Sequence, residues 1–141
     1  MKAILNLQVA IDKKDGNAVE DALILCYDKE GGEDYVGLLV QLLLANWHMM
    51  HEDVALELQR LRSPLAVPAL RVTATRKFQY LEYNGSHALA RKCTWALADI
   101  GTKESKDKLI EITACEDPEV AGCAQKRLTN WESELGRKGA E

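Results

Sequence analysis

Two histidines and two carboxylates lie close together near position 50, and their side chains are the best suited to chemistry. His48 and His51 are three residues apart, so on a helix they share a face, and Glu52 and Asp53 follow directly. Imidazole and carboxylate groups are common zinc ligands, so this spacing could begin a metal site. The HExxH order is missing, however, and only His87 could add a third imidazole. We favour a polar turn between two helices, where His51 or Asp53 caps the next helix, and expect no metal and no cofactor.

Other catalytic patterns are missing from the sequence. It has no glycine-rich loop for a phosphate and no GxSxG motif for a nucleophilic serine. The four cysteines form no CxxC pair, and three of them fall within apolar helical patterns, which favours buried free thiols in a reducing compartment. No apolar run approaches the roughly 20 residues that span a bilayer. We therefore expect a cytoplasmic protein that is not an enzyme and does not bind a membrane.

Aromatic and acidic residues gather around two stretches that do not follow a helical pattern. Tyr and Trp are common in binding hot spots because they bring a large contact area at a small entropy cost. We expect the neighbouring Phe78, Leu81 and Trp95 to pack inward instead. The candidate partner contacts are Trp47, His48, His51, Tyr80 and Tyr83, with the carboxylates of Glu30, Glu33, Asp34, Glu52, Asp53 and Glu82.

Charge is unevenly distributed along the chain, whose net charge is −4. Residues 1–59 hold 11 acidic and 4 basic side chains, residues 60–92 hold 7 basic and 1 acidic, and residues 93–119 hold 7 acidic and 3 basic. Acidic flanks on both sides of a basic band disfavour binding to nucleic acid. The pattern fits better with a protein partner of opposite potential. The basic band consists of Arg60, Arg62, Arg71, Arg76, Lys77, Arg91 and Lys92.

Apolar residues recur at helical spacing along nearly the whole chain and predict about eight helices in one domain. Residues 35–44 are apolar almost all round, which indicates a central helix. Residues 4–11 also alternate like a strand, but without a second strand to pair with we expect a helix. We expect the polar residues 132–141 to form a frayed tail.

Capping residues divide these helices. Asn17 with Glu20 three positions later fits a capping box, and Gly31-Gly32 separates the second helix from the third. A longer connection is expected between Thr75 and Ser86. Further helix starts are expected at Ser63-Pro64, Thr102 after Gly101, and Asp117-Pro118.

The helices repeat with a constant offset. Leu58, Ser63 and Leu70 are followed 39 residues later by Leu97, Thr102 and Leu109. A period of roughly 40 residues with two helices per unit is typical of HEAT and armadillo arrays. We therefore expect an all-α chain folded as a right-handed solenoid of stacked helical hairpins, with a plain helical bundle as the alternative.

Three stretches within about residues 40–131 resemble small bacterial HEAT-repeat-like proteins. They are Trp47–Asp53 (WHMMHED), Arg91–Thr102 (RKCTWALADIGT) and Ala124–Trp131 (AQKRLTNW). Proteins of that group commonly act as immunity proteins against polymorphic or contact-dependent growth inhibition toxins. The resemblance thus implies a protein that binds and neutralises a cognate toxin as a monomer in a 1:1 complex. The charge sign suggests a basic nuclease domain as that toxin. The alternatives are a general HEAT-type scaffold for proteins and, less favoured, a DNA-binding HEAT-like protein.

Overall fold

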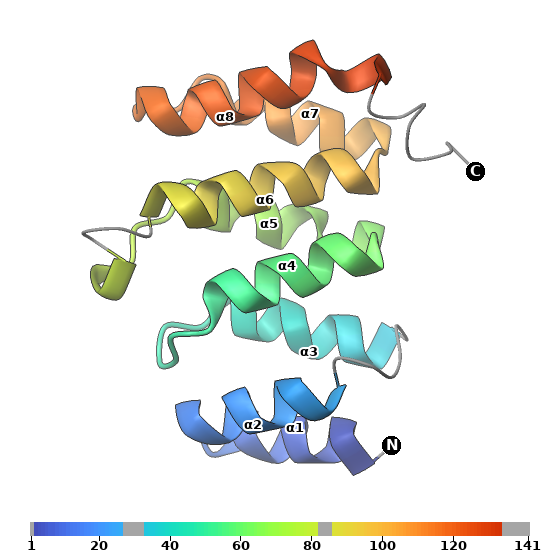
Figure 1. Ribbon diagram of the computed structural model, residues 1–141, viewed down its shortest axis with the longest axis vertical. Helices are drawn as coiled ribbons and strands as arrows, with labels where there is room; N and C mark the ends of the chain where they lie inside the picture. Colours follow the sequence, from blue (N-terminus) through green and yellow to red (C-terminus); the bar gives the residue numbers. More distant parts are fainter. Residues whose placement is uncertain (1, 27–32, 82–85, 134–141) are drawn as a thin grey trace.

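The computed structural model describes residues 2–26, 33–81 and 86–133 (Figure 1). Every regular element in these residues is a helix, so the all-α prediction is confirmed, and the ambiguous first segment is helical. None of these helices is both long enough and apolar enough to cross a membrane. The α-helices are α1 (Lys2–Asp12), α2 (Gly16–Cys26), α3 (Glu33–Leu44), α4 (His51–Leu61), α5 (Val67–Ala74), α6 (Ser86–Ile100), α7 (Lys103–Ile112) and α8 (Pro118–Thr129). The 3₁₀ helices are η1 (Pro64–Ala66) and η2 (Gln79–Leu81).

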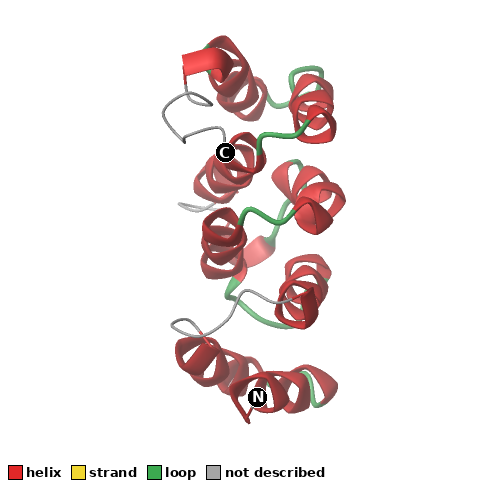
Figure 2. Ribbon diagram, turned by 90° about the vertical axis from the view of Figure 1, so that its right-hand side faces the viewer, coloured by secondary structure: helices red, strands yellow, loops and turns green. Residues whose placement is uncertain are grey.

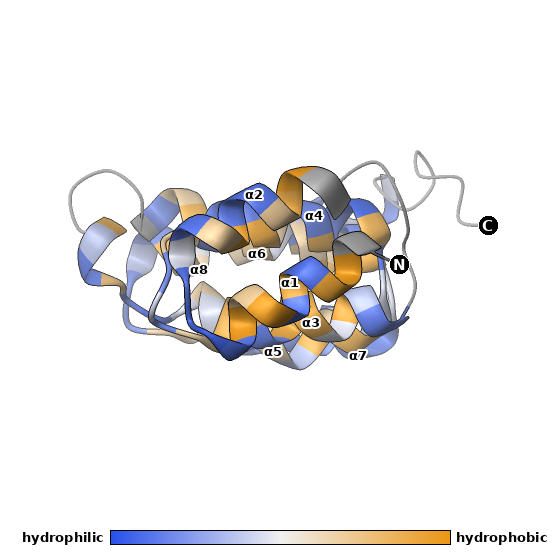
Figure 3. Cartoon of the chain, turned by 90° about the horizontal axis from the view of Figure 1, so that it is seen from below, coloured by the Kyte–Doolittle hydropathy of each residue, from blue (hydrophilic) through white to orange (hydrophobic). Residues whose placement is uncertain are grey.

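Consecutive helices pair into hairpins that are stacked along the long axis of the molecule (Figures 1 and 2). Viewed along that axis, α2, α4, α6 and α8 lie in one layer and α1, α3, α5 and α7 in the other (Figure 3). The buried apolar side chains form one cluster between these layers, with Leu39, Leu42 and Leu43 of α3 fully buried. Phe78 and Leu81 belong to this cluster, so the prediction that they pack inward is confirmed.

Most of the predicted helix starts are confirmed. Thr102 accepts a hydrogen bond from the Ser105 N–H, and Asp117 caps the start of α8. Ser63 caps η1, which leads into α5. The prediction of Asn17 as a cap is wrong, because Asp15 accepts the hydrogen bond of the Ala18 N–H and α2 already begins at Gly16. Gly31-Gly32 and most of the expected tail lie outside the described residues.

Polar side chains join the three later hairpins to one another at a constant sequence separation. Four side-chain hydrogen bonds in the described part of the chain connect residues 40 positions apart, and we call them the inter-hairpin bonds. They are Gln59–Asp99 at 2.8 Å, Arg71–Glu111 at 3.1 Å, Lys77–Asp117 at 2.7 Å and Glu52–Lys92 at 3.0 Å. Three of them pair a cation from the basic band with a carboxylate from an acidic flank. The uneven charge along the chain therefore serves contacts between neighbouring hairpins.

The N-terminal hairpin is joined to the rest differently. In the layer of even-numbered helices, α4 packs along α6, and α6 packs along α8, but α2 makes few contacts with α4. The hairpin is held through α1, which packs on α2 and also contacts α3. None of the four inter-hairpin bonds reaches it. The stack is therefore more open between α2 and α4 than between α4 and α6 or between α6 and α8.

Candidate functional site

The two histidines singled out by the sequence satisfy the carboxyl end of α3. The last carbonyls of a helix have no partner within the helix and need one from elsewhere. His48 Nε2 donates to the Leu42 carbonyl at 2.6 Å, and its Nδ1 accepts the Met50 N–H at 2.9 Å. His51 Nε2 donates to the Ala45 carbonyl at 2.7 Å. The prediction that His51 or Asp53 caps the next helix is wrong, because α4 begins without a side-chain cap and His51 binds the end of the preceding helix.

A tyrosine from the loop after α5 completes this cluster. The Tyr80 hydroxyl donates to His51 Nδ1 at 2.6 Å and accepts the His51 N–H at 3.3 Å. Arg76 donates to the Leu44 carbonyl at 2.7 Å and lies over the Phe78 ring. The His51 ring lies between those of His48 and Phe78; it is stacked on His48 at a centroid distance of 4.2 Å and tilted against Phe78 at 4.1 Å. This arrangement attaches the loop to the end of α3.

Burial and these bonds fix the charge state of the cluster. Burial lowers the pKa of His51 to about 4 and also lowers the pKa of His48. Both rings are therefore neutral near pH 7, with every nitrogen already hydrogen bonded. A metal ion could bind here only by displacing the main-chain partners, and no cluster of three potential ligands occurs in the described residues. The histidines therefore act as structural groups, and the hydroxyl of Tyr80 is engaged with them.

Other predicted contact residues are also engaged within the chain. Glu52 binds Lys92, so its carboxylate is neutralised by α6. Trp47 is partly buried against the core, and its ring meets that of His48 edge-on. Trp95, which was expected to pack inward, is half-buried under the Arg127 guanidinium at 3.6 Å. Glu30, Glu82 and Tyr83 lie outside the described residues.

The thiols fit the expected pattern in part. Cys93 is fully buried, and this burial raises its pKa far above the ordinary value. Cys115 and Cys123 are free and half-buried. The side chain of Cys26 is outside the described part of the chain. The buried Cys93 thiol is therefore protonated and unreactive in the folded protein.

A groove of about 320 Å³ lies where α2 and α4 fail to pack. That volume is near the lower end of the roughly 300–1,000 Å³ typical of ligand sites. The groove is lined mainly by apolar groups, with carboxylates among them. Its lining residues are Glu20, Leu23 and Ile24 of α2, Tyr35 of α3, Met50 before α4, and Asp53, Leu56 and Glu57 of α4.

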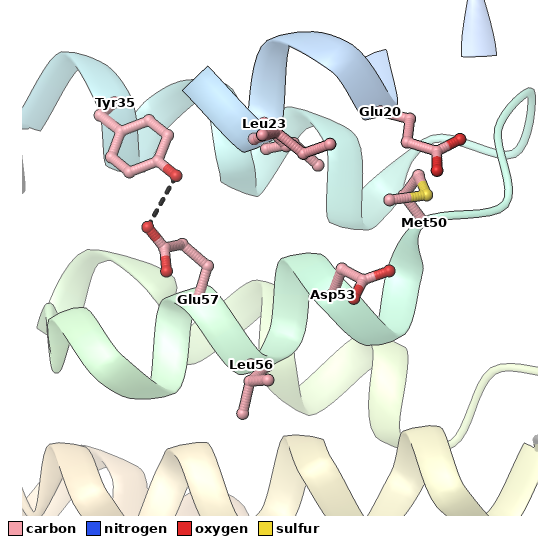
Figure 4. Close-up of a pocket in the computed structure, with 8 residues that line it drawn as sticks. Glu20, Leu23, Tyr35, Met50, Asp53, Leu56 and Glu57 are labelled. Atoms are coloured by element: carbon pink, nitrogen blue, oxygen red, sulfur yellow. Dashed lines mark hydrogen bonds between the residues drawn. The ribbon is translucent and has the colours of Figure 1, made fainter. Parts of the chain in front are cut away.

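Carboxylates occupy both ends of this groove. Figure 4 shows Glu57 beside Tyr35 at one end, Leu23 in the middle, and Glu20, Met50 and Asp53 toward the other end. Glu57 is only 4% exposed; it accepts the Tyr35 hydroxyl at 2.7 Å and binds Arg60. Glu20 and Asp53 are exposed and form no ion pair within the described residues. One end of the groove is therefore neutralised, and the other end presents two free carboxylates.

Sequence reasoning found only Asp53 among the groove residues. Glu33 and Asp34, also predicted as contacts, are exposed in the first turn of α3. The clearest signal in the sequence was Glu57, a carboxylate next to Leu58 within the apolar stripe of residues 54–61. A charged group there needs a buried partner or a nearby ligand.

Comparisons with known proteins identify no relative. No protein-family model matches the chain, and neither the curated proteins nor the solved structures contain a significant match. No relative therefore assigns a role to any residue of this chain.

Proposed function

We propose that this chain is a HEAT-like immunity protein that binds a cognate toxin domain and blocks its active site. In this proposal the stacked hairpins form a right-handed solenoid, and the bonds between residues 40 positions apart support a repeat of that length. The protein works in the cytoplasm by binding alone, as a monomer in a 1:1 complex. The specific role as an immunity protein rests on the resemblance of residues 40–131 to that group.

The observation that carries the proposal is the different use of acidic and basic side chains. Four of the seven cations of the basic band (Arg71, Arg76, Lys77 and Lys92) bind a neighbouring hairpin, whereas several carboxylates in the N-terminal half are exposed without an ion pair in the described residues. Those on α2, α3 and α4 include Glu20, Glu33, Asp34 and Asp53. The surface over α2, α3 and α4 therefore has an uncompensated negative charge. Such a surface accelerates encounter with a basic protein and suits the cleft of a nuclease, which must attract phosphates.

DNA binding is less well supported by the same contacts. A protein that binds DNA must place several free cations on one face, because affinity comes from released counterions. Arg71, Lys77 and Lys92 bind carboxylates, and Arg76 binds the end of α3. A general scaffold for cellular proteins remains the second candidate. It is favoured by the same acidic surface but predicts no protection against a toxin.

In this proposal a toxin is encoded next to this gene, and co-expression of the two proteins tests it. Cells that make the toxin should survive only when this protein is present, and the two proteins should elute together from a sizing column. A charge-reversed variant, E20K/D53K, should protect less, whereas the control E116K/E132K carries the same change in net charge on exposed positions elsewhere and should protect fully. Survival of toxin-producing cells without the protein, or separate elution of the two proteins, would contradict the proposal. Equal protection by both variants would place the contact at residues other than Glu20 and Asp53.

A further inference from the structure

We propose that the groove between α2 and α4 binds one Lys or Arg side chain of the partner protein. Its aliphatic stem lies against Leu23 and Met50, and its charged group lies between Glu20 and Asp53. This proposal rests on the proposed function, since it assigns to the toxin the cation that enters the groove. It also makes the N-terminal hairpin part of the binding site.

The shape and lining of the groove fit such a side chain. Lys and Arg bury a stem of three or four methylene groups along apolar surface while the charged head stays among polar groups. The groove offers both environments, because Leu23 and Met50 lie next to the carboxylates at its open end (Figure 4). Its volume of about 320 Å³ suits a single long side chain, whereas a whole helix would not fit.

The electrostatics of the groove favour a cation from outside the chain. Three carboxylates line it from α2 and α4, and no basic residue is among its lining residues in the described part of the chain. Arg60 neutralises Glu57 at one end, so the excess negative charge lies at Glu20 and Asp53. Carboxylates that face each other across a gap repel, and this repulsion opposes closer packing of α2 on α4. A cation between them removes that repulsion and gains attraction from both.

The neighbouring pair of helices, α4 and α6, shows what such a bridge does. Between α4 and α6, Lys92 reaches across to Glu52, and these two helices pack closely. At the open end of the groove, α2 supplies Glu20 and α4 supplies Asp53, and no described residue supplies a cation to either. The side chain of the partner would take the place between α2 and α4 that Lys92 takes between α4 and α6. Binding is therefore expected to fasten the N-terminal hairpin to the rest of the stack.

Affinity measurements on the complex with the toxin that the co-expression experiment identifies test the assignment. Replacing both free carboxylates in E20Q/D53N keeps the side-chain size and is expected to raise the Kd at least tenfold, mainly through faster dissociation. The control variant E116Q/E132Q removes the same charge from exposed positions outside the groove and should change the Kd less than twofold. If E20Q/D53N binds the toxin as tightly as the unchanged protein, the groove proposal is wrong and the immunity function stands.

A second measurement needs no toxin. Hexylammonium carries an aliphatic stem with a cationic head, and hexanoate has a similar stem with the opposite charge. In NMR titrations, hexylammonium should shift the backbone amides of residues 20–24 and 50–57, hexanoate should not, and E20Q/D53N should abolish the shifts. If hexylammonium shifts these amides but the protein forms no complex with a toxin, the immunity function is wrong and the cation-binding groove stands. Absence of hexylammonium shifts there would overturn the groove itself.

Discussion

Glu52 of α4 and Lys92 of α6 lie 40 positions apart in the sequence, with Oε1 and Nζ at 3.0 Å. Both side chains are about one-third exposed, so the pair is partly shielded from solvent. Gln59 and Asp99 join the same two helices further along at the same separation. The register between α4 and α6 is therefore fixed at two points by polar contacts as well as by apolar packing.

Reversing one charge of this pair should destabilise the protein, and exchanging both charges should restore most of the loss. We expect K92E to unfold at lower urea concentration than the unchanged protein, because the carboxylate introduced on α6 would then repel Glu52. The exchange E52K/K92E should recover most of that difference, with a coupling free energy of about 0.5–1 kcal/mol in a double-mutant cycle.

The pair Lys103 and Asp107 provides a control for this cycle. It lies within α7 at 3.7 Å, and its side chains are 91% and 55% exposed, so it does not join two hairpins. Its coupling should be about 0.3–0.5 kcal/mol or less. A Glu52–Lys92 coupling no larger than this one would mean that the inter-hairpin bond does not contribute to the stacking.

The buried histidines predict a loss of stability in mild acid. The folded protein holds the pKa of His51 at about 4, below its ordinary value of 6.5. Between these values the unfolded chain binds more protons than the folded one, so the free energy of unfolding must fall as the pH falls through that range. His48 acts in the same direction. The contribution of His51 to the free energy of unfolding is fully present above about pH 6.5 and is lost by about pH 4. This change amounts to at most about 3 kcal/mol.

Urea unfolding at pH 7 and pH 4.5 measures this effect. The variant H51Q should be less stable at pH 7, because it loses the bonds to the Ala45 carbonyl and Tyr80, but it should lose less stability on acidification. Asp117 does not act in this window, since Lys77 and His87 lower its pKa and its contribution is lost only below the ordinary carboxylate range. An acid-induced loss of the same size in H51Q would assign the effect to other groups.

The sequence predicted the features that depend on near neighbours in the chain. Apolar periodicity determined the helices, and the starts at Ser63, Thr102 and Asp117 were recognisable because cap and helix are adjacent. The start of α2 was misplaced because Asp15 and Asn17 are both good caps, and only the geometry shows which one accepts a bond. Local signals therefore identify helices more reliably than they identify the residue at which each begins.

The candidate site could not be predicted in the same way. Its groove exists because α2 and α4, which are not consecutive, do not pack against one another, and no local pattern encodes a missing contact. The histidines were misjudged for a related reason. Their partners are carbonyls at the end of α3 and a hydroxyl 29 residues away, whereas the sequence shows only two imidazoles next to carboxylates.

The facing carboxylates of the groove also predict a conflict between stability and binding. If Glu20 and Asp53 repel across the gap, E20Q/D53N should raise the free energy of unfolding by about 0.2–0.5 kcal/mol at low salt, the usual size of repulsion between neighbouring like charges. The gain should shrink in about 0.5 M NaCl, because salt screens exposed charges.

The control E116Q/E132Q should show no comparable gain. A destabilised E20Q/D53N would instead mean that these carboxylates help to hold α2 and α4 together. A stabilised variant that no longer binds would show that the repulsion is kept because the partner requires it.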